Sequence, residues 1–162
     1  MLTVAGIRDR IATELQASLE LKKHRPLKLI KGINPETEIF LYPGVSKKRG
    51  ELRLVPVIGI ENFVLRERLL STGWNGDTRA CHAYLGMLDS WGHLVVHSEA
   101  DLDKAATRLV KSIKEVGLPI MMNFDSSDKV AALFAETLAH HVNKWHVAVI
   151  FAKEKLAALR TN

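Results

Sequence analysis

Apolar positions recur along the chain with two different periods, one typical of helices and one typical of strands. Residues 4–19 carry apolar side chains at steps of three and four, which predicts an amphipathic helix. Pro26 is expected to end this first run. Shorter apolar segments predict three strands, at 27–33, 37–43 and 51–60. The turns between them are predicted at Asn34-Pro35 and in the loop "PGVSKKRG".

The second half of the chain begins with further strand and helix signals. Pro56 has no amide hydrogen, so the third strand is predicted to be an edge strand or to carry a bulge there. Asn62 and Gly73 have the positions of a helix cap and a helix stop. Residues 80–97 predict a β-hairpin, and three helices are predicted after it. The first is predicted to begin at Ser98 and to end at Gly117 and Pro119. The second is predicted to begin at Asp125 or Ser126, and the third to extend from about residue 146 to about residue 160.

This order of elements predicts the fold class. Neighbouring strands are joined by short turns rather than by helical crossovers, which favours antiparallel pairing. We expect a single α+β domain over residues 1–162, because no repeat or linker divides the chain. Its antiparallel sheet of about five strands is expected to carry the N-terminal helix and the C-terminal helices on one face.

The predicted hairpin holds the one cysteine and three of the seven histidines. With Asp89-Ser90 as its turn, His82 would pair with His97, and side chains would alternate between two faces. The apolar face would carry Cys81, Ala83, Leu85, Met87, Leu94 and Val96. The opposite face would carry His82, Tyr84, Trp91, His93, Val95 and His97. Of these, His82, Tyr84, Trp91 and His97 are the predicted binding residues.

This alternation argues against a zinc site formed by Cys81 and the histidines. Cys81 and His82 would point to opposite faces of the sheet. His93 and His97 share a face but lie about 13 Å apart along a strand, too far for two imidazoles at about 2 Å from one zinc ion. Only His82 and His97 could meet, so a metal-dependent enzyme that uses these two histidines is a remaining alternative. We expect no metal site and no cofactor.

The composition favours a folded cytoplasmic protein. No apolar run approaches the roughly 20 residues of a membrane span, and the N-terminus lacks the apolar core of a signal peptide. A single cysteine excludes an internal disulfide. We therefore expect a cytoplasmic location and no contact with membranes, while the oligomeric state stays open.

The formal net charge of +5 comes from the first third of the sequence. Residues 1–60 hold 11 Lys and Arg against 6 Asp and Glu, whereas residues 61–162 hold 12 of each. Two basic segments, 22–31 and 46–50, could meet at one end of the sheet and neutralise phosphates. The residues that would bind a nucleic acid or an acidic partner are Lys22, Lys23, Arg25, Lys47, Lys48 and Arg49. Lysine-rich sheet edges that prevent aggregation have the same appearance.

The order of motifs from residue 51 to about residue 135 carries a family resemblance. A strand ending in P-x-x-G precedes a short helix, and an "LG-L" segment and a tryptophan-containing strand lead to an amphipathic helix ending in G-x-P. These positions are Pro56, Gly59, Leu85, Gly86, Leu88, Trp91, Gly117 and Pro119. The chain thereby resembles uncharacterised bacterial domains that include predicted toxin-immunity proteins. The resemblance implies a fold and a role in protein binding, and it transfers no catalytic residue.

These observations favour a binding protein over an enzyme. We expect a cytoplasmic domain that binds another protein and has no enzymatic activity. Its role would resemble that of toxin-immunity proteins, and its partner is unknown. The basic N-terminal third departs from the acidic surfaces that inhibitors of nuclease toxins tend to present. Nucleic-acid binding through the basic edge is the first alternative, and the histidine-dependent metalloenzyme is the second.

Overall fold

The N-terminal helix follows the apolar stripe predicted for it. The computed structural model describes residues 1–25, 28–74 and 81–140. Helix α1 (Val4–Leu19) begins after Thr3, whose hydroxyl oxygen accepts a hydrogen bond from the Gly6 amide at 3.0 Å. Its buried positions are Ile7, Ile11, Ala12, Leu15 and Leu19. The helix ends before Pro26, because Glu20 adopts a left-handed conformation and the chain enters a strand.

Five strands form an antiparallel sheet, here called sheet A. They are β1 (Lys22–Arg25), β2 (Lys28–Asn34), β3 (Thr37–Tyr42), β6 (Val57–Asn62) and β7 (Cys81–Tyr84), in the order β1-β2-β3-β6-β7. The predicted strands 27–33 and 37–43 correspond to β2 and β3. The α+β class with an antiparallel sheet of five strands is therefore confirmed.

A second sheet, sheet B, was not predicted. It contains β4 (Val45–Lys48), β5 (Glu51–Leu54) and β8 (Leu94–Val96), in the order β4-β5-β8. The predicted loop "PGVSKKRG" thus contains a strand, and only Arg49 and Gly50 form the turn after it. The predicted strand 51–60 is two strands that belong to different sheets. Pro56 lies where the chain passes from sheet B to sheet A, since it cannot donate to a ladder.

The predicted hairpin at 80–97 is wrong. β7 pairs with β6, so that His82 lies opposite Gly59, whereas β8 pairs with β5, so that Val95 lies opposite Arg53. Helix α3 (Leu85–Leu88) stands between them. The chain reverses tightly here, and a Cβ atom on Gly86 would lie 1.7 Å from the Gly92 carbonyl oxygen. Alternation along the two strands is the same in both arrangements, so the apolar pattern could not distinguish them.

Of the remaining helical elements, those that begin after Asn62, Ser98 and Ser126 keep their predicted starts, whereas the two between Ile113 and Met122 were not predicted as separate elements. The remaining elements are α2 (Phe63–Ser71), α4 (Glu99–Ser112), a π-helical turn η1 (Ile113–Gly117), α5 (Leu118–Met122) and α6 (Ser127–His140). Asn62 and Ser98 accept hydrogen bonds from the first turns of α2 and α4, and Ser126 accepts one from the Lys129 amide. Gly117 does not end the helical path. It allows close packing on sheet A, since a Cβ atom there would lie 2.9 Å from Ile58 Cδ1.

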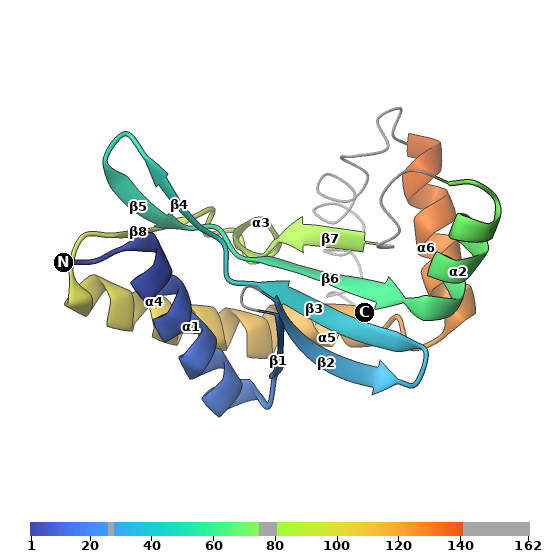
Figure 1. The fold of residues 1–162 in the computed structure, drawn as a ribbon, viewed down its shortest axis with the longest axis horizontal. Coiled ribbons are helices and arrows are strands. Elements are labelled where there is room, and N and C mark those ends of the chain that lie inside the picture. Colours follow the sequence, from blue (N-terminus) through green and yellow to red (C-terminus); the bar gives the residue numbers. More distant parts are fainter. Residues whose placement is uncertain (26–27, 75–80, 141–162) are drawn as a thin grey trace.

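The core lies between the two sheets and the helices α1, α4 and α5, which Figure 1 shows on one side of the sheets. Leu54 and Val96 of sheet B and Ile58 and Ala83 of sheet A are almost completely buried in it. Helices α2 and α6 pack on each other at the far end of sheet A (Figure 1). No helix within residues 1–25, 28–74 and 81–140 combines the length and apolarity needed to cross a bilayer. The helix predicted near 146–160 lies outside the described residues.

Candidate functional site

A groove runs along the outer side of α4, beside the edge of sheet B. Strand β4 contacts α1 and strand β8 contacts α4, so sheet B lies across both helices and ends at β8. The groove has a volume of about 710 Å³, within the usual size of a ligand site. It is lined by Leu94, Val95, Asp101, Asp103, Lys104, Ala105, Thr107, Arg108 and Lys111. We call it the β8–α4 groove.

Three cations form one wall of the β8–α4 groove. Lys104, Arg108 and Lys111 are four and three residues apart on α4, which places them on one face of the helix. All three are exposed, and none makes an ion pair or a side-chain hydrogen bond with any residue in the described part of the chain. Their charges are therefore available to a ligand.

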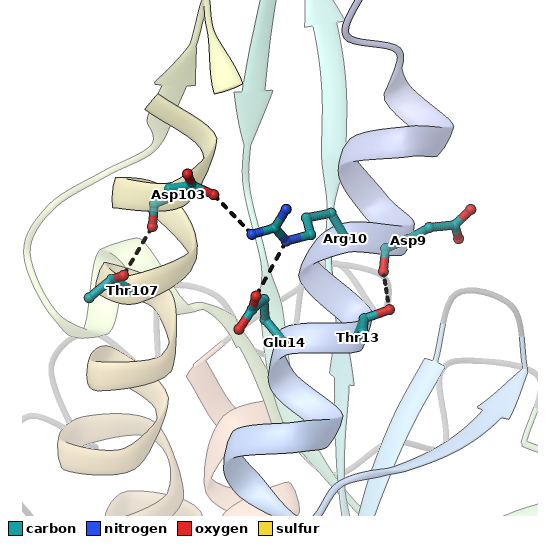
Figure 2. Close-up of polar contacts among 6 residues, drawn as sticks. All are labelled: Asp9, Arg10, Thr13, Glu14, Asp103 and Thr107. Carbon is teal, nitrogen blue, oxygen red and sulfur yellow. Dashed lines mark hydrogen bonds and ion pairs between the residues drawn. The ribbon is translucent and has the colours of Figure 1, made fainter. Parts of the chain in front are cut away.

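The acid Asp103, in contrast, is already paired. Arg10 of α1 donates from Nη2 to Asp103 Oδ1 at 3.0 Å and from Nε to Glu14 Oε1 at 3.3 Å. Figure 2 shows Arg10 between these two carboxylates, where it joins α1 to α4. The side chains are 40–63% exposed, so this bridge contributes little to stability. Its consequence for the groove is that the charge of Asp103 is compensated from the other side of the helix.

The second acid, Asp101, belongs to the cap of α4. Its amide donates to Ser98 Oγ at 3.2 Å, and its Oδ2 accepts from the His97 amide at 3.1 Å. These contacts form a capping box. The hydrogen bond with the Ser98 side chain, followed by that from the His97 backbone, lowers the pKa of Asp101 below its ordinary value of 3.8. Both acids of the groove thus have partners within the fold, while its three cations have none among the residues that the structure describes.

The remaining lining residues are mostly apolar. Leu94 and Val95 come from β8, and Ala105 from the buried side of α4. Leu94 also packs against the core, which holds this side of the groove in place. An apolar floor beside three unpaired cations suits a ligand that carries both apolar groups and negative charge.

The predicted binding residues do not share one face. His82 and Tyr84 lie on β7 in sheet A, where Tyr84 is 42% exposed. His97 follows β8 in sheet B and is exposed. Trp91 donates from Nε1 to Ser112 Oγ at 3.0 Å and packs against the core, so it anchors the segment before β8. The common face depended on the hairpin, and it is lost together with the hairpin.

The same correction applies to the remaining metal alternative. His82 and His97 were expected to lie opposite each other, but they belong to strands of separate sheets. Among the residues that the structure describes, no group of three or more His, Cys, Asp or Glu side chains is arranged to hold a metal ion.

The predicted basic edge is also divided. Lys22, Lys23 and Arg25 lie on β1, at the edge of sheet A, and all three are exposed. Lys47 and Lys48 lie on β4 and Arg49 in the turn after it, at the edge of sheet B. In Figure 1 the β4–β5 hairpin extends away from β1. Two separate basic edges therefore replace the single predicted patch.

A charged cluster that was not predicted lies on the face of sheet A opposite the helices α1, α4 and α5. Lys28 Nζ lies 3.5 Å from Glu38 Oε1 and 3.2 Å from Glu61 Oε2, and Arg66 Nη1 lies 3.2 Å from Glu61 Oε1. The ammonium group of Lys28 also lies 5.6 Å from the centre of the Phe40 ring. The side chains of Lys28, Glu38 and Glu61 are only 11–14% exposed. Every charge in this cluster has a partner, which favours a structural role.

Comparisons of the chain with protein-family models, curated proteins and solved structures give no match. The resemblance to predicted toxin-immunity proteins therefore stays a prediction.

Proposed function

We propose that this protein binds another protein by accepting an acidic segment of it in the β8–α4 groove. One observation carries the proposal, namely that the groove's two acids have partners inside the fold whereas Lys104, Arg108 and Lys111 have none among the described residues. Complementary charge of this kind steers association and selects partners by sign. An immunity-like role, in which the partner is a toxin, is one form that such binding can take.

The lining of the groove favours a polypeptide over a nucleic acid. Proteins that bind single strands combine cations with aromatic side chains on which bases stack. The described residues that line the β8–α4 groove include no aromatic side chain. Leu94, Val95 and Ala105 offer apolar contact that suits aliphatic side chains of a peptide. Nucleic-acid binding through the two basic edges is the outcome against which the proposal is tested.

A selection from random twelve-residue peptides displayed on phage tests this proposal. We expect the enriched peptides to carry a net negative charge and to bind in a salt-sensitive way. The variant Lys104→Glu/Arg108→Glu/Lys111→Glu should bind a synthesised, enriched peptide at least tenfold more weakly. Lys22→Glu/Lys23→Glu/Arg25→Glu, which reverses three exposed charges on β1, is the matched control and should bind it normally.

Two results would overturn the proposal. In the first, the enriched peptides are not acidic, or their binding is the same in the groove variant as in the unchanged protein. In the second, no peptide is enriched, while a 20-nucleotide DNA or RNA is retarded at low salt and the β1 control variant abolishes that retardation. Circular dichroism of both variants establishes that they are folded.

A further inference from the structure

We infer that the acidic segment binds as an extended strand that pairs with the free edge of β8, an inference that rests on the proposed function. The groove lies beside this edge, because Leu94 and Val95 line it together with α4. Strand addition of this kind obtains affinity from main-chain hydrogen bonds and specificity from alternate side chains. Three observations support it.

The first observation is that β8 is an unprotected edge. Within the described part of the chain it pairs only with β5 and is the last strand of sheet B. Proteins commonly guard such edges with charged residues, above all lysine. The edge strands β1 and β4 fit this rule, with the sequences KKHR and VSKK, whereas β7, at the other edge of sheet A, has the sequence CHAY. β8 has the sequence LVV and carries no charge.

The second observation is that the peptide groups of Val95 face away from β5. Arg49 and Gly50 have φ values of 52° and 84°, as in a two-residue type I′ turn. In such a turn the residue after it, Glu51, donates its amide back to β4. Because amide directions alternate along a strand, the amide and carbonyl of Arg53 also point toward β4. Those of its neighbours Leu52 and Leu54 point toward β8. Their register partners on β8, Leu94 and Val96, therefore bond to β5, and Val95 faces outward.

The hydrogen bond of the His97 amide independently indicates the same alternation of amide directions along β8. This amide donates to Asp101 Oδ2, and so it points toward α4 and not toward β5. Residues two apart along a strand point their amides to the same side. The amide and carbonyl of Val95 are thus directed to the open side of β8, toward the groove.

The third observation is that the cations lie where one face of an added strand would be. Sheet B crosses over α1 at β4 and over α4 at β8, so the next strand position lies over the outer side of α4. That side carries Lys104, Arg108 and Lys111. Since side chains alternate along a strand, every second residue of the added strand would face these cations. The expected ligand therefore alternates acidic and apolar residues.

An eight-residue peptide of alternating Glu and Val, labelled with fluorescein and measured by fluorescence anisotropy, is the probe. It should bind at least fivefold more tightly than a peptide of the same composition with four Glu followed by four Val. Two N-methylated forms sharpen the test, one methylated on the Glu amides and one on the Val amides. Only one set of amides can face β8, so one form should bind at least tenfold more weakly and the other within about threefold of the parent.

The protein itself offers a matched pair of variants. Val95→Pro removes the amide that faces the groove, which a sheet tolerates on the open side of an edge strand. It should fold and should bind the alternating peptide at least tenfold more weakly. Lys47→Pro removes an outward-facing amide from β4, at the other edge of sheet B, and as the matched control it should fold and bind the peptide normally. If Val95→Pro fails to fold, the amide is used inside the sheet and the outward assignment is wrong.

The outcomes separate this inference from the function on which it rests. If acidic peptides from the display selection bind, but the two N-methylated forms bind equally well or the block peptide binds as tightly as the alternating one, then the ligand is not an added strand. The inference then fails and the proposed function stands. If no acidic peptide of either kind binds, both fail. A loss confined to one methylated form and to Val95→Pro supports the inference.

Discussion

Charged side chains have different roles on the two sheets of this protein. On the outer face of sheet A, Lys28, Glu38 and Glu61 are nearly buried and each has an oppositely charged neighbour within 3.5 Å. Along the edge of sheet B, the three cations of the β8–α4 groove are exposed and have no such neighbour among the described residues. A charge with a partner inside the fold contributes to folding, whereas a charge without one is available for binding.

This contrast shows that the distribution of net charge along the sequence does not by itself locate the cations that are available for binding. The excess of positive charge lies in residues 1–60, which predicts an interface in that part of the chain. The structure separates those residues into two sheet edges and buries one of them, Lys28, between two acids. The cations with the clearest access to a groove come from 104–111, in the part of the chain whose charges balance.

Replacing Lys28 should affect stability most. Lys28→Met leaves Glu38 and Glu61 opposite each other across β3 and β6 without the ammonium group between them. Breaking a buried ion pair in this way should cost about 3 kcal/mol of unfolding free energy, the lower end of the usual range, because these side chains are 11–14% exposed. Urea denaturation at pH 7 measures it.

Lys104→Met is the matched control for this substitution. It removes the same charge from the groove, where the lysine has no partner among the described residues. Its unfolding free energy should stay within about 0.5 kcal/mol of the unchanged protein. Equal losses at the two positions would show that the two regions do not differ in the way described above.

Asp101→Asn should have an intermediate effect that depends on pH. The pKa of Asp101 is lowered in the folded protein, chiefly by its hydrogen bond with Ser98. A lowered pKa means that the carboxylate stabilises the fold above the ordinary value of 3.8, and that this stabilisation is lost as the pH falls through the folded pKa. The variant should therefore melt at a lower temperature than the unchanged protein at pH 7, with the difference shrinking below pH 3.8.

Asp128→Asn provides the comparison for this measurement. Asp128 is an exposed acid in the first turn of α6 and has no side-chain partner among the described residues. Thermal unfolding followed by circular dichroism at pH 7, 5 and 3 should show a smaller change for Asp128→Asn than for Asp101→Asn. A difference between Asp101→Asn and the unchanged protein that is the same at all three pH values would contradict the role given to the Asp101 carboxylate.

The helices and their caps could be predicted because they depend on local sequence. The caps Asn62, Ser98 and Ser126 could be predicted because each lies a few residues before an apolar stripe. The cap Thr3 was not predicted. The α+β class and strands β2 and β3 follow in the same way from apolar runs and the turn between them. Alternation in β8 is also local, and Val96 is buried as predicted while His97 is exposed.

Strand partners could not be predicted because they depend on contacts distant in sequence. Nothing in residues 80–97 shows that β7 pairs with β6 while β8 pairs with β5. The cluster around Lys28 likewise needs the register of three strands. The cations of the groove did have a sequence signal, in their spacing of four and three along one helix. The neighbouring acids Asp101 and Asp103 obscured it, because only the structure shows that both are engaged elsewhere.

The smallest effect expected is also the most specific to the groove. Arg108 stands four residues from Lys104 and three from Lys111, so each neighbour repels it. Arg108→Gln keeps a good helix former and removes this repulsion. The unfolding free energy should rise by about 0.2–0.5 kcal/mol at low salt. The gain should vanish near 1 M salt, where charges on the surface are screened.

A matched measurement on Arg10 decides between repulsion and a general effect of losing a cation. Arg10 is paired with Glu14 and Asp103, so Arg10→Gln should lower the unfolding free energy slightly where Arg108→Gln raises it. Urea titrations of the two variants at low and high salt compare the signs directly. If Arg108→Gln were destabilising by 1 kcal/mol or more, Arg108 would have a partner within the fold, and the groove would no longer present three free cations. Opposite signs that converge at high salt would show that the fold leaves these charges uncompensated, at a small cost in its own stability.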